Sequence, residues 1–224
     1  MELIRIAIDG PSGAGKSTMA KMISKELGIT YLDTGSMYRA VALKAIRAGV
    51  DTRDRESVSK IMPGIAISVM YDNGSQRIFM DGEDVTAVIR TNEVSMGASN
   101  VSAFPEVRTR LVELQREIAR NQSVVMDGRD IGTHVLPQAD LKIYLTASVK
   151  DRAQRRYNEL KEKGLLDKTL EQMTKEIETR DYNDSNREFS PLKKADDAVV
   201  LDTSGYSCED STQRIIDIIR KRFK

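Results

Sequence analysis

The sequence has 224 residues, a length between one and two typical domains and sufficient for a single buried core. Its hydrophobic fraction of 40% and charged fraction of 31% are ordinary for a soluble globular protein. The 35 basic residues nearly balance the 34 acidic ones, so the totals do not indicate a general nucleic-acid-binding surface. One cysteine excludes an intrachain disulfide, and no apolar run is long enough to cross a bilayer. We therefore expect a cytoplasmic monomer that binds neither nucleic acid nor membrane.

The first fifty residues alternate between short apolar strands and helical segments. Residues 3–9 and 29–33 are predicted to form strands. Apolar residues at helical spacing predict a helix from Lys16 to a stop at Gly28, and a second helix over residues 35–49. Two strand-to-helix units of this kind indicate an α/β protein with a parallel sheet.

The pattern then changes to the period of an antiparallel sheet. Over residues 65–71 the larger residues Ile65, Ile67, Val69 and Tyr71 alternate with Ala66, Ser68 and Met70, which is the period of a strand. Residues 72–75 are typical of a tight turn, and residues 76–80 are predicted to form the returning strand of a hairpin. A second turn follows at Asp81 and Gly82. We expect a small antiparallel insert, placed approximately at residues 62–101.

The rest of the chain returns to helices and buried strands. Helical spacing resumes at Thr91, strengthens at Pro105 and ends near Asn121. A charged helical stretch is predicted over residues 148–186, and a final helix starts at Ser207. Three short apolar runs are typical of buried parallel strands: residues 124–126, 141–145 and 198–201. The final helix is expected to turn four apolar residues inward: Ile215, Ile216, Ile219 and Phe223.

A glycine-rich loop directly follows the first strand and fits the pattern G-x-x-x-x-G-K-S. Glycines let backbone N–H groups surround phosphate oxygens, and the following helix directs its positive end toward them. Lys16 suits the outer phosphates, and the Ser17 hydroxyl suits a magnesium ion. The sequence therefore predicts a nucleoside triphosphate site formed by Gly10, Pro11, Ser12, Gly13, Ala14, Gly15, Lys16, Ser17 and Thr18.

This loop occurs in many protein classes. The sequence lacks the Asn-Lys-x-Asp motif by which most GTPases read guanine and the Leu-Ser-Gly-Gly signature of transporter ATPases. Both absences weaken those interpretations. A short chain with the phosphate chemistry in one domain favours a small-molecule kinase.

Two arginines are placed to bind a second phosphate. Arg39 follows the second predicted strand and Arg129 follows the strand at 124–126, and ligands of open α/β sheets bind outside the carboxyl ends of strands. A guanidinium donates paired hydrogen bonds to phosphate and keeps its charge. Three further arginines, Arg152, Arg155 and Arg156, lie in a highly charged helix. A solvated helix face and a role over the transferred phosphate explain those three equally well.

Four segments, taken together and in order, resemble the bacterial cytidylate kinase family. They are Gly-Pro-Ser-Gly-Ala-Gly-Lys-Ser at 10–17, Leu-Asp-Thr-Gly-Ser-Met-Tyr-Arg at 32–39, Asp-Gly-Arg-Asp-Ile-Gly-Thr at 127–133 and Ser-Pro-Leu-Lys-Lys-Ala-Asp-Asp-Ala at 190–198. The resemblance extends from Ile6 to about Thr203. The chain departs from the family at Ser36, where alanine is common, and at His134, where a small apolar residue is common.

The resemblance implies a three-layer P-loop kinase fold in one domain, residues 1–224. This fold would have a parallel sheet, the antiparallel insert as a nucleoside-monophosphate-binding part, and a helical lid at about residues 148–168. The implied activity is transfer of the γ-phosphate from ATP, with Mg²⁺, to CMP or dCMP in pyrimidine nucleotide metabolism.

The resemblance also assigns roles to individual residues. Arg39 and Arg129 would hold the acceptor phosphate and, with Lys16 and Asp130, would form the catalytic set. Arg152 and Arg156 would join the ATP site, with Ser17 as the metal ligand. The substrate-binding set implied for the acceptor is Thr34, Tyr38, Arg39, Ser99, Arg108, Asp127, Arg129, Asp130, Arg180, Asp184 and Arg187. Within it, Ser99, Arg108, Asp130 and Arg187 would line the cytosine pocket, and Arg180 and Asp184 would approach the sugar.

Several alternatives remain open at this point. Asp33, Asp127 and Asp130 are equal candidates for assisting magnesium or the acceptor. Kinases for AMP, UMP, shikimate or dephospho-coenzyme A share the architecture, and a nucleotide-binding regulator would share the loop. His134 and Cys208 receive no functional role.

Overall fold

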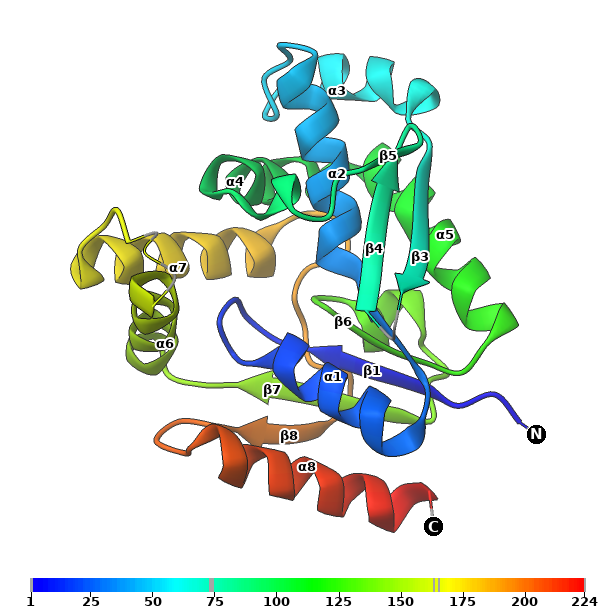
Figure 1. The fold of residues 1–224 in the computed structure, drawn as a ribbon, viewed down its shortest axis with the longest axis vertical. Helices are drawn as coiled ribbons and strands as arrows, with labels where there is room; N and C mark the ends of the chain where they lie inside the picture. The colour runs from blue at the N-terminus through cyan, green and yellow to red at the C-terminus, as the bar shows by residue number, and fades with distance from the viewer. Residues whose placement is uncertain (1, 73–74, 163, 165, 224) are drawn as a thin grey trace. The chain divides into compact units, whose positions relative to one another are not determined.

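The structure is a computed structural model that describes residues 2–72, 75–162, 164 and 166–223. The chain divides into two compact units. The P-loop unit comprises Met1–Ile29 and Ser123–Lys224, and the insert unit comprises Thr30–Gln122. Figure 1 labels the helices and strands of both units.

The P-loop unit is built on a parallel sheet whose strands run in the order β6-β1-β7-β8. These strands are β1 (Arg5–Asp9), β6 (Val124–Gly128), β7 (Leu141–Thr146) and β8 (Val199–Asp202). The register places Asp9 beside Gly128 on one side and Tyr144 on the other, so the carboxyl ends of three strands meet at one edge. Ile6, Ile8 and Val125 are completely buried, as the apolar runs predict.

The P-loop unit contains four α-helices among its described residues, and glycine ends the first of them. They are α1 (Lys16–Leu27), α6 (Val149–Glu162), α7 (Leu170–Asn186) and α8 (Cys208–Phe223), with a π-helical turn at Ile131–Val135. Helix α1 ends at Gly28, whose φ of 65° is the left-handed conformation that glycine adopts at helix ends. Helix α1 packs against β6 and α8.

The charged stretch predicted over residues 148–186 is two helices rather than one. Helix α7 starts afresh at a capping box, in which Thr169 and Gln172 satisfy each other's backbone N–H groups. Helices α6 and α7 enclose a small apolar cluster of their own, formed by Ala153, Leu160, Met173 and Ile177. The sequence analysis did not separate the two helices, because the few apolar residues in this highly charged stretch do not show where α6 ends and α7 begins.

The insert unit contains the predicted antiparallel sheet, in the order β3-β4-β5. Its elements are β2 (Thr30–Asp33), α2 (Thr34–Arg47), α3 (Arg55–Ile61), a 3₁₀ turn at Met62–Gly64, β3 (Ile67–Asp72), β4 (Ser75–Met80), β5 (Glu83–Asp84), a 3₁₀ turn at Val88–Arg90, α4 (Asn92–Val101) and α5 (Pro105–Asn121). Strands β3 and β4 pair from Ile67–Met80 to Asp72–Ser75. The turn residues expected between them, Asn73 and Gly74, lie outside the described residues.

Other differences from the sequence predictions are small. Helix α3 was not predicted, because it has seven residues and buries only Val58, although Asp54 caps its start by accepting from two backbone N–H groups. In α8, Ile215 and Ile219 are buried, whereas Ile216 and Phe223 are only partly buried. The side chain of Cys208 lies outside the described residues. Among the helices that the structure describes, we find none with the length and apolar character that crossing a membrane demands.

Candidate active site

The phosphate loop has a backbone that requires glycine. Gly10 has a φ of 150°, and a Cβ placed there would lie 1.9 Å from the carbonyl oxygen of Leu145 in β7. Gly13 and Gly15 also have positive φ, at 76° and 93°. Because these conformations are strained for other residues, the glycines set the path of the loop from β1 into α1.

Lys16 is the buried cation of this loop. Its side chain is largely inaccessible, with the residue 6% exposed, and its Nζ donates a 2.6 Å hydrogen bond to the carbonyl of Pro11. Burial lowers the pKa of Lys16 well below its ordinary value, and the nearby charge of Arg129 lowers it further. A phosphate group in the loop would supply the negative charge that favours the ammonium form.

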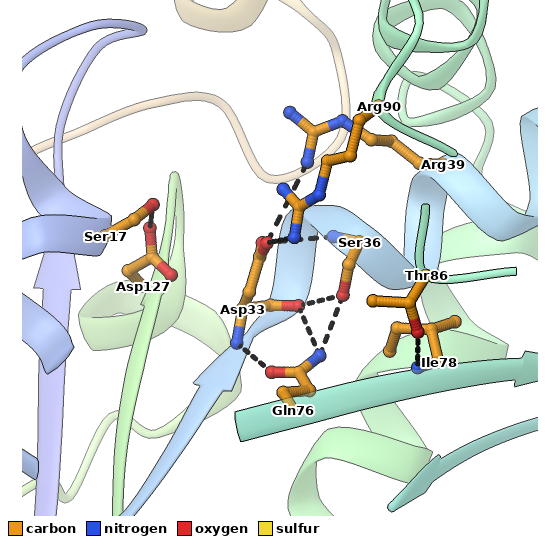
Figure 2. A network of polar contacts seen from close by, with 9 residues as sticks. All are labelled: Ser17, Asp33, Ser36, Arg39, Gln76, Ile78, Thr86, Arg90 and Asp127. Atoms are coloured by element: carbon orange, nitrogen blue, oxygen red, sulfur yellow. Dashed lines mark hydrogen bonds and ion pairs between the residues drawn. The ribbon is translucent and has the colours of Figure 1, made fainter. Parts of the chain in front are cut away.

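Ser17 and Asp127 form a pair of hard oxygen donors beside the loop. The Ser17 hydroxyl donates to Asp127 Oδ2 at 3.0 Å, as Figure 2 shows. Mg²⁺ usually keeps several waters and binds one or two protein oxygens together with the phosphates. The described residues contain no cluster of three or more metal-ligating side chains, and such a cage is not needed for this mode of binding. The donor set therefore fits Mg²⁺ held with a nucleotide.

Arg129 leaves the carboxyl end of β6, as predicted, and pairs with an acidic residue of α7. Its Nε donates to Asp184 Oδ2 at 2.7 Å, and both side chains are largely buried. Burial alone would raise the pKa of Asp184, but the charges of Arg129 and Arg180 outweigh it and hold the pKa below the ordinary value. Arg180 also lowers the pKa of Lys16, so these predicted residues share one electrostatic environment.

Arg187 and Asp130 form a second buried pair in the same unit. Arg187 Nη2 lies 3.6 Å from Asp130 Oδ1, and Arg187 Nε donates to the carbonyl of Ser190 at 2.6 Å. Asp130 comes from the loop after β6, and Arg187 follows the last turn of α7. The structure thus brings together the hydrogen-bond donors of Arg187 and the carboxylate of Asp130, which suit the polar edge of a nucleotide base.

The three arginines of α6 have different surroundings. Arg152 is buried, donates to the carbonyl of Ser12 in the phosphate loop at 2.9 Å, and pairs with Asp181 at 2.6 Å. The solvated-face interpretation is therefore wrong for Arg152. Arg155 bonds to Thr203, and Arg156 pairs with Glu159 on the helix surface at 3.1 Å.

In the insert unit, Asp33 organises the first turn of α2. Its Oδ1 accepts from Ser36 N at 3.1 Å, and its Oδ2 lies 3.0 Å from Arg90 Nη2 and 4.0 Å from Arg39 Nη1 (Figure 2). The Gln76 side chain of β4 accepts from Asp33 N at 2.6 Å and donates to the Ser36 hydroxyl at 2.8 Å. Ser36 therefore gives the antiparallel sheet a polar contact to α2 that alanine lacks.

Tyr38 and Arg108 lie together in the same unit. Arg108 is 1% exposed, its guanidinium lies 5.4 Å from the centre of the Tyr38 ring, and its Nη1 donates to Ser102 O at 3.2 Å. Ser99, on α4, is partly buried, and its carbonyl accepts from the Ser102 hydroxyl. Thr34 is buried at the first position of α2.

The sequence interpretation missed several polar residues that support these groups, above all Asp9. Asp9 is 4% exposed, and its two carboxylate oxygens accept from the backbone N–H groups of Ile131 and Gly132, each at 2.7 Å. It thereby fixes the turn that follows Arg129 and Asp130. Burial raises the pKa of Asp9 from its ordinary value of 3.8 to about 6, despite the two N–H donors. The signal available in the sequence was a carboxylate at the end of a buried strand.

The raised pKa of Asp9 predicts a pH-dependent stability. Between pH 3.8 and about 6 the folded chain keeps a proton that the unfolded chain has released. The stability contribution of Asp9 therefore falls as pH rises through this window, by on the order of 3 kcal/mol. We expect the unfolding free energy of the wild type, relative to Asp9→Asn, to decrease by this amount from pH 4 to pH 7 in urea titrations.

The exposed variant Asp196→Asn is the control for the loss of one carboxylate. The difference in unfolding free energy between the wild type and Asp196→Asn should change much less over the same pH range. If the difference in unfolding free energy between the wild type and Asp9→Asn stays constant with pH, proton binding at Asp9 is not linked to folding.

His134 makes a packing contact with an aromatic ring. Its ring meets that of Phe189 edge-on, with centroids 5.6 Å apart and an interplanar angle of 79°.

Comparison with known proteins identifies the family. The family model described as cytidylate kinase matches residues 6–221. This chain belongs to the cytidylate kinase family. A cytidylate kinase of Caldicellulosiruptor bescii is 50% identical over 224 residues, covering 100% of this chain and 99% of the relative. One from Streptococcus pneumoniae is 49% identical over 223 residues, covering 99% of this chain and 100% of the relative.

Solved structures agree with this cytidylate kinase family assignment at the level of the fold. A gluconokinase from Sinorhizobium meliloti has a TM-score of 0.51 and 10% identity, covering 97% of this chain and 92% of its own. An uncharacterized protein from Eubacterium ventriosum has a TM-score of 0.53 and 14% identity, covering 98% and 99%. The predicted α/β kinase fold with a parallel sheet and a small antiparallel sheet is confirmed.

Proposed function

We propose that this member of the cytidylate kinase family transfers the γ-phosphate of ATP to CMP or dCMP, giving ADP and CDP or dCDP. The observation that carries the proposal is that Arg129 leaves the carboxyl end of β6 directly beside the end of β1, from which the phosphate loop of Lys16 starts. A protein that only binds ATP has no need of a second, largely buried cation beside the phosphate loop. A kinase needs it, because a second phosphate must be brought to the first.

The donor half of the reaction is assigned to the phosphate loop. Its backbone N–H groups and Lys16 would hold the outer phosphates, and Arg152 would support the loop through the Ser12 carbonyl. Mg²⁺, held by Ser17 and Asp127 with the nucleotide, would neutralise charge on the phosphates. No side chain needs to act as a nucleophile, because the acceptor phosphate oxygen attacks directly.

The acceptor half is assigned to the residues that the family resemblance implies. Arg129, with Arg39 and Thr34 of the insert unit, would bind the acceptor's phosphate and hold its oxygen in line with the γ-phosphate. Asp130 would accept from the cytosine amine, while Arg187 and Arg108 would donate to its acceptor edge, with Ser99 and Tyr38 beside them. Arg180 and Asp184 would contact the sugar.

Further properties follow from the same proposal. The insert at about residues 62–101 would bind the monophosphate, and residues 148–168, with Arg156, would act as a lid that excludes water from the reaction. The protein would act in pyrimidine nucleotide metabolism as a cytoplasmic monomer, without nucleic acid or membrane partners.

A panel of acceptors tests the function directly. Steady-state rates with ATP and Mg²⁺ should give the highest kcat/KM for CMP or dCMP, compared with AMP, UMP, shikimate and dephospho-coenzyme A. A preference for AMP or shikimate would overturn the choice of substrate. Absence of CDP with every acceptor would overturn the assignment as a kinase.

A further inference from the structure

Arg90 is a charged residue to which neither the sequence motifs nor the proposed mechanism gives a role. It ends the 3₁₀ turn Val88–Arg90, directly before the helix α4 that carries Ser99. Its neighbour Ile89 is completely buried, so the backbone at this point is anchored in the core of the insert unit. The Arg90 side chain, in contrast, is 54% exposed, which makes its guanidinium accessible to a ligand.

Arg90 and Arg39 approach the same atom from two different elements. Their guanidinium groups lie 3.0 Å and 4.0 Å from Asp33 Oδ2, and Figure 2 shows both directed at this oxygen. The other oxygen of Asp33 is committed to capping α2, where it accepts from Ser36 N. Like charges repel, so two arginines gathered at one oxygen mark a place built for an anion.

Gly35 keeps this place open. A Cβ at position 35 would lie 3.2 Å from Asp33 Oδ1 and 3.5 Å from Arg39 Nη1. Even an alanine side chain would therefore lie closer than an ordinary contact to the carboxylate of Asp33 and would touch the guanidinium of Arg39. The start of the 14-residue helix α2 adds partial positive charge at the same point. The carboxylate oxygen of Asp33 thus marks a position at which the guanidinium groups of Arg39 and Arg90 can bind an oxygen of an anionic ligand.

We propose that Arg90 is a further binding residue for the phosphate of the acceptor nucleotide, acting beside Arg39. Asp33 positions both side chains in the absence of substrate, and the arriving phosphate takes over the hydrogen bond of Arg90 and the ion pair of Arg39. This inference rests on the proposed function, since it extends the acceptor-phosphate site by one residue. Arg90 thereby links that site to α4, the helix of Ser99.

The test separates phosphate binding from binding of the nucleoside. Arg90→Ala should raise the KM and the Kd for CMP by about 10- to 100-fold, as expected for loss of a charged hydrogen bond. The KM for ATP should change less than about twofold, and the Kd for cytidine, which has no phosphate, should stay the same. Arg90→Lys should recover part of the loss, because it restores the charge without the paired geometry.

Arg53→Ala is the matched control. Arg53 is an exposed arginine of the same unit, 77% exposed, and pairs with Asp51 at 3.0 Å. Its replacement should leave all four constants unchanged. A CMP affinity in Arg90→Ala equal to that of the control would overturn the inference, and so would equal weakening of CMP and cytidine. If the wild type forms no CDP, the proposed function itself fails, and this inference fails with it.

Discussion

Replacement of Lys16 by alanine is expected to lower kcat by about a thousandfold, the effect of removing a preorganised charge from a transition state. Lys16 is buried, and its Nζ donates a hydrogen bond to the Pro11 carbonyl of its own loop. Because burial disfavours its charge, loss of the ammonium should cost little stability. We expect the unfolding free energy to change by less than about 2 kcal/mol. Rates of CDP formation and urea denaturation measure the two effects.

Lys21→Ala is the control for this variant. Lys21 is an exposed lysine on the same helix α1, and its loss should leave kcat and stability close to the wild-type values. Wild-type turnover in Lys16→Ala would refute the role of Lys16 at the phosphates. An unfolded Lys16→Ala protein would show that the residue is needed for the fold instead.

Replacement of Arg129 by alanine should damage both catalysis and stability. Removal of the acceptor-phosphate contact is expected to lower kcat/KM for CMP by about 10³-fold, with a smaller change in the KM for ATP. The variant also leaves the buried Asp184 carboxylate without its 2.7 Å partner. Removing one partner of a buried pair typically costs about 3–5 kcal/mol, and the remaining charge of Arg180 should keep the loss toward the lower end of this range. Steady-state kinetics and urea denaturation measure the two losses.

The double variant Arg129→Ala/Asp184→Asn distinguishes these losses. It removes both charges of the pair, so most of the stability should return while the activity stays low. Recovery of activity together with stability would mean that Arg129 acts only on the fold. A change confined to the KM for ATP would mean that Arg129 belongs to the donor side.

Most of the fold was predictable because its signals are local. Gly28 ended α1, and the alternation after Ile65 marked the antiparallel sheet. The break between α6 and α7 was not found, because helix spacing in a charged segment is compatible with one helix or two. It depends on the cap formed by Thr169 and Gln172, which is visible only once the helix start is known.

The candidate site was predictable where a motif follows a strand. Arg129 and the phosphate loop are examples, because carboxyl ends of parallel strands share one edge. Asp9 and Arg90 were missed because their partners are distant in the chain: the backbone of Ile131 and Gly132 for Asp9, and Asp33 for Arg90. Such contacts exist only after folding. The assigned binding roles remain predictions for the experiments above.

The small apolar cluster between α6 and α7 has a consequence for motion. The two helices form a hairpin with an apolar core of its own. This core is formed by Ala153 and Leu160 of α6, which pack with Met173 and Ile177 of α7. A displacement of this hairpin as a rigid body preserves the 2.6 Å pairing of Arg152 with Asp181. It breaks the bond from Arg152 to the loop at Ser12, and also the bond from Arg129, at the end of β6, to Asp184 of α7.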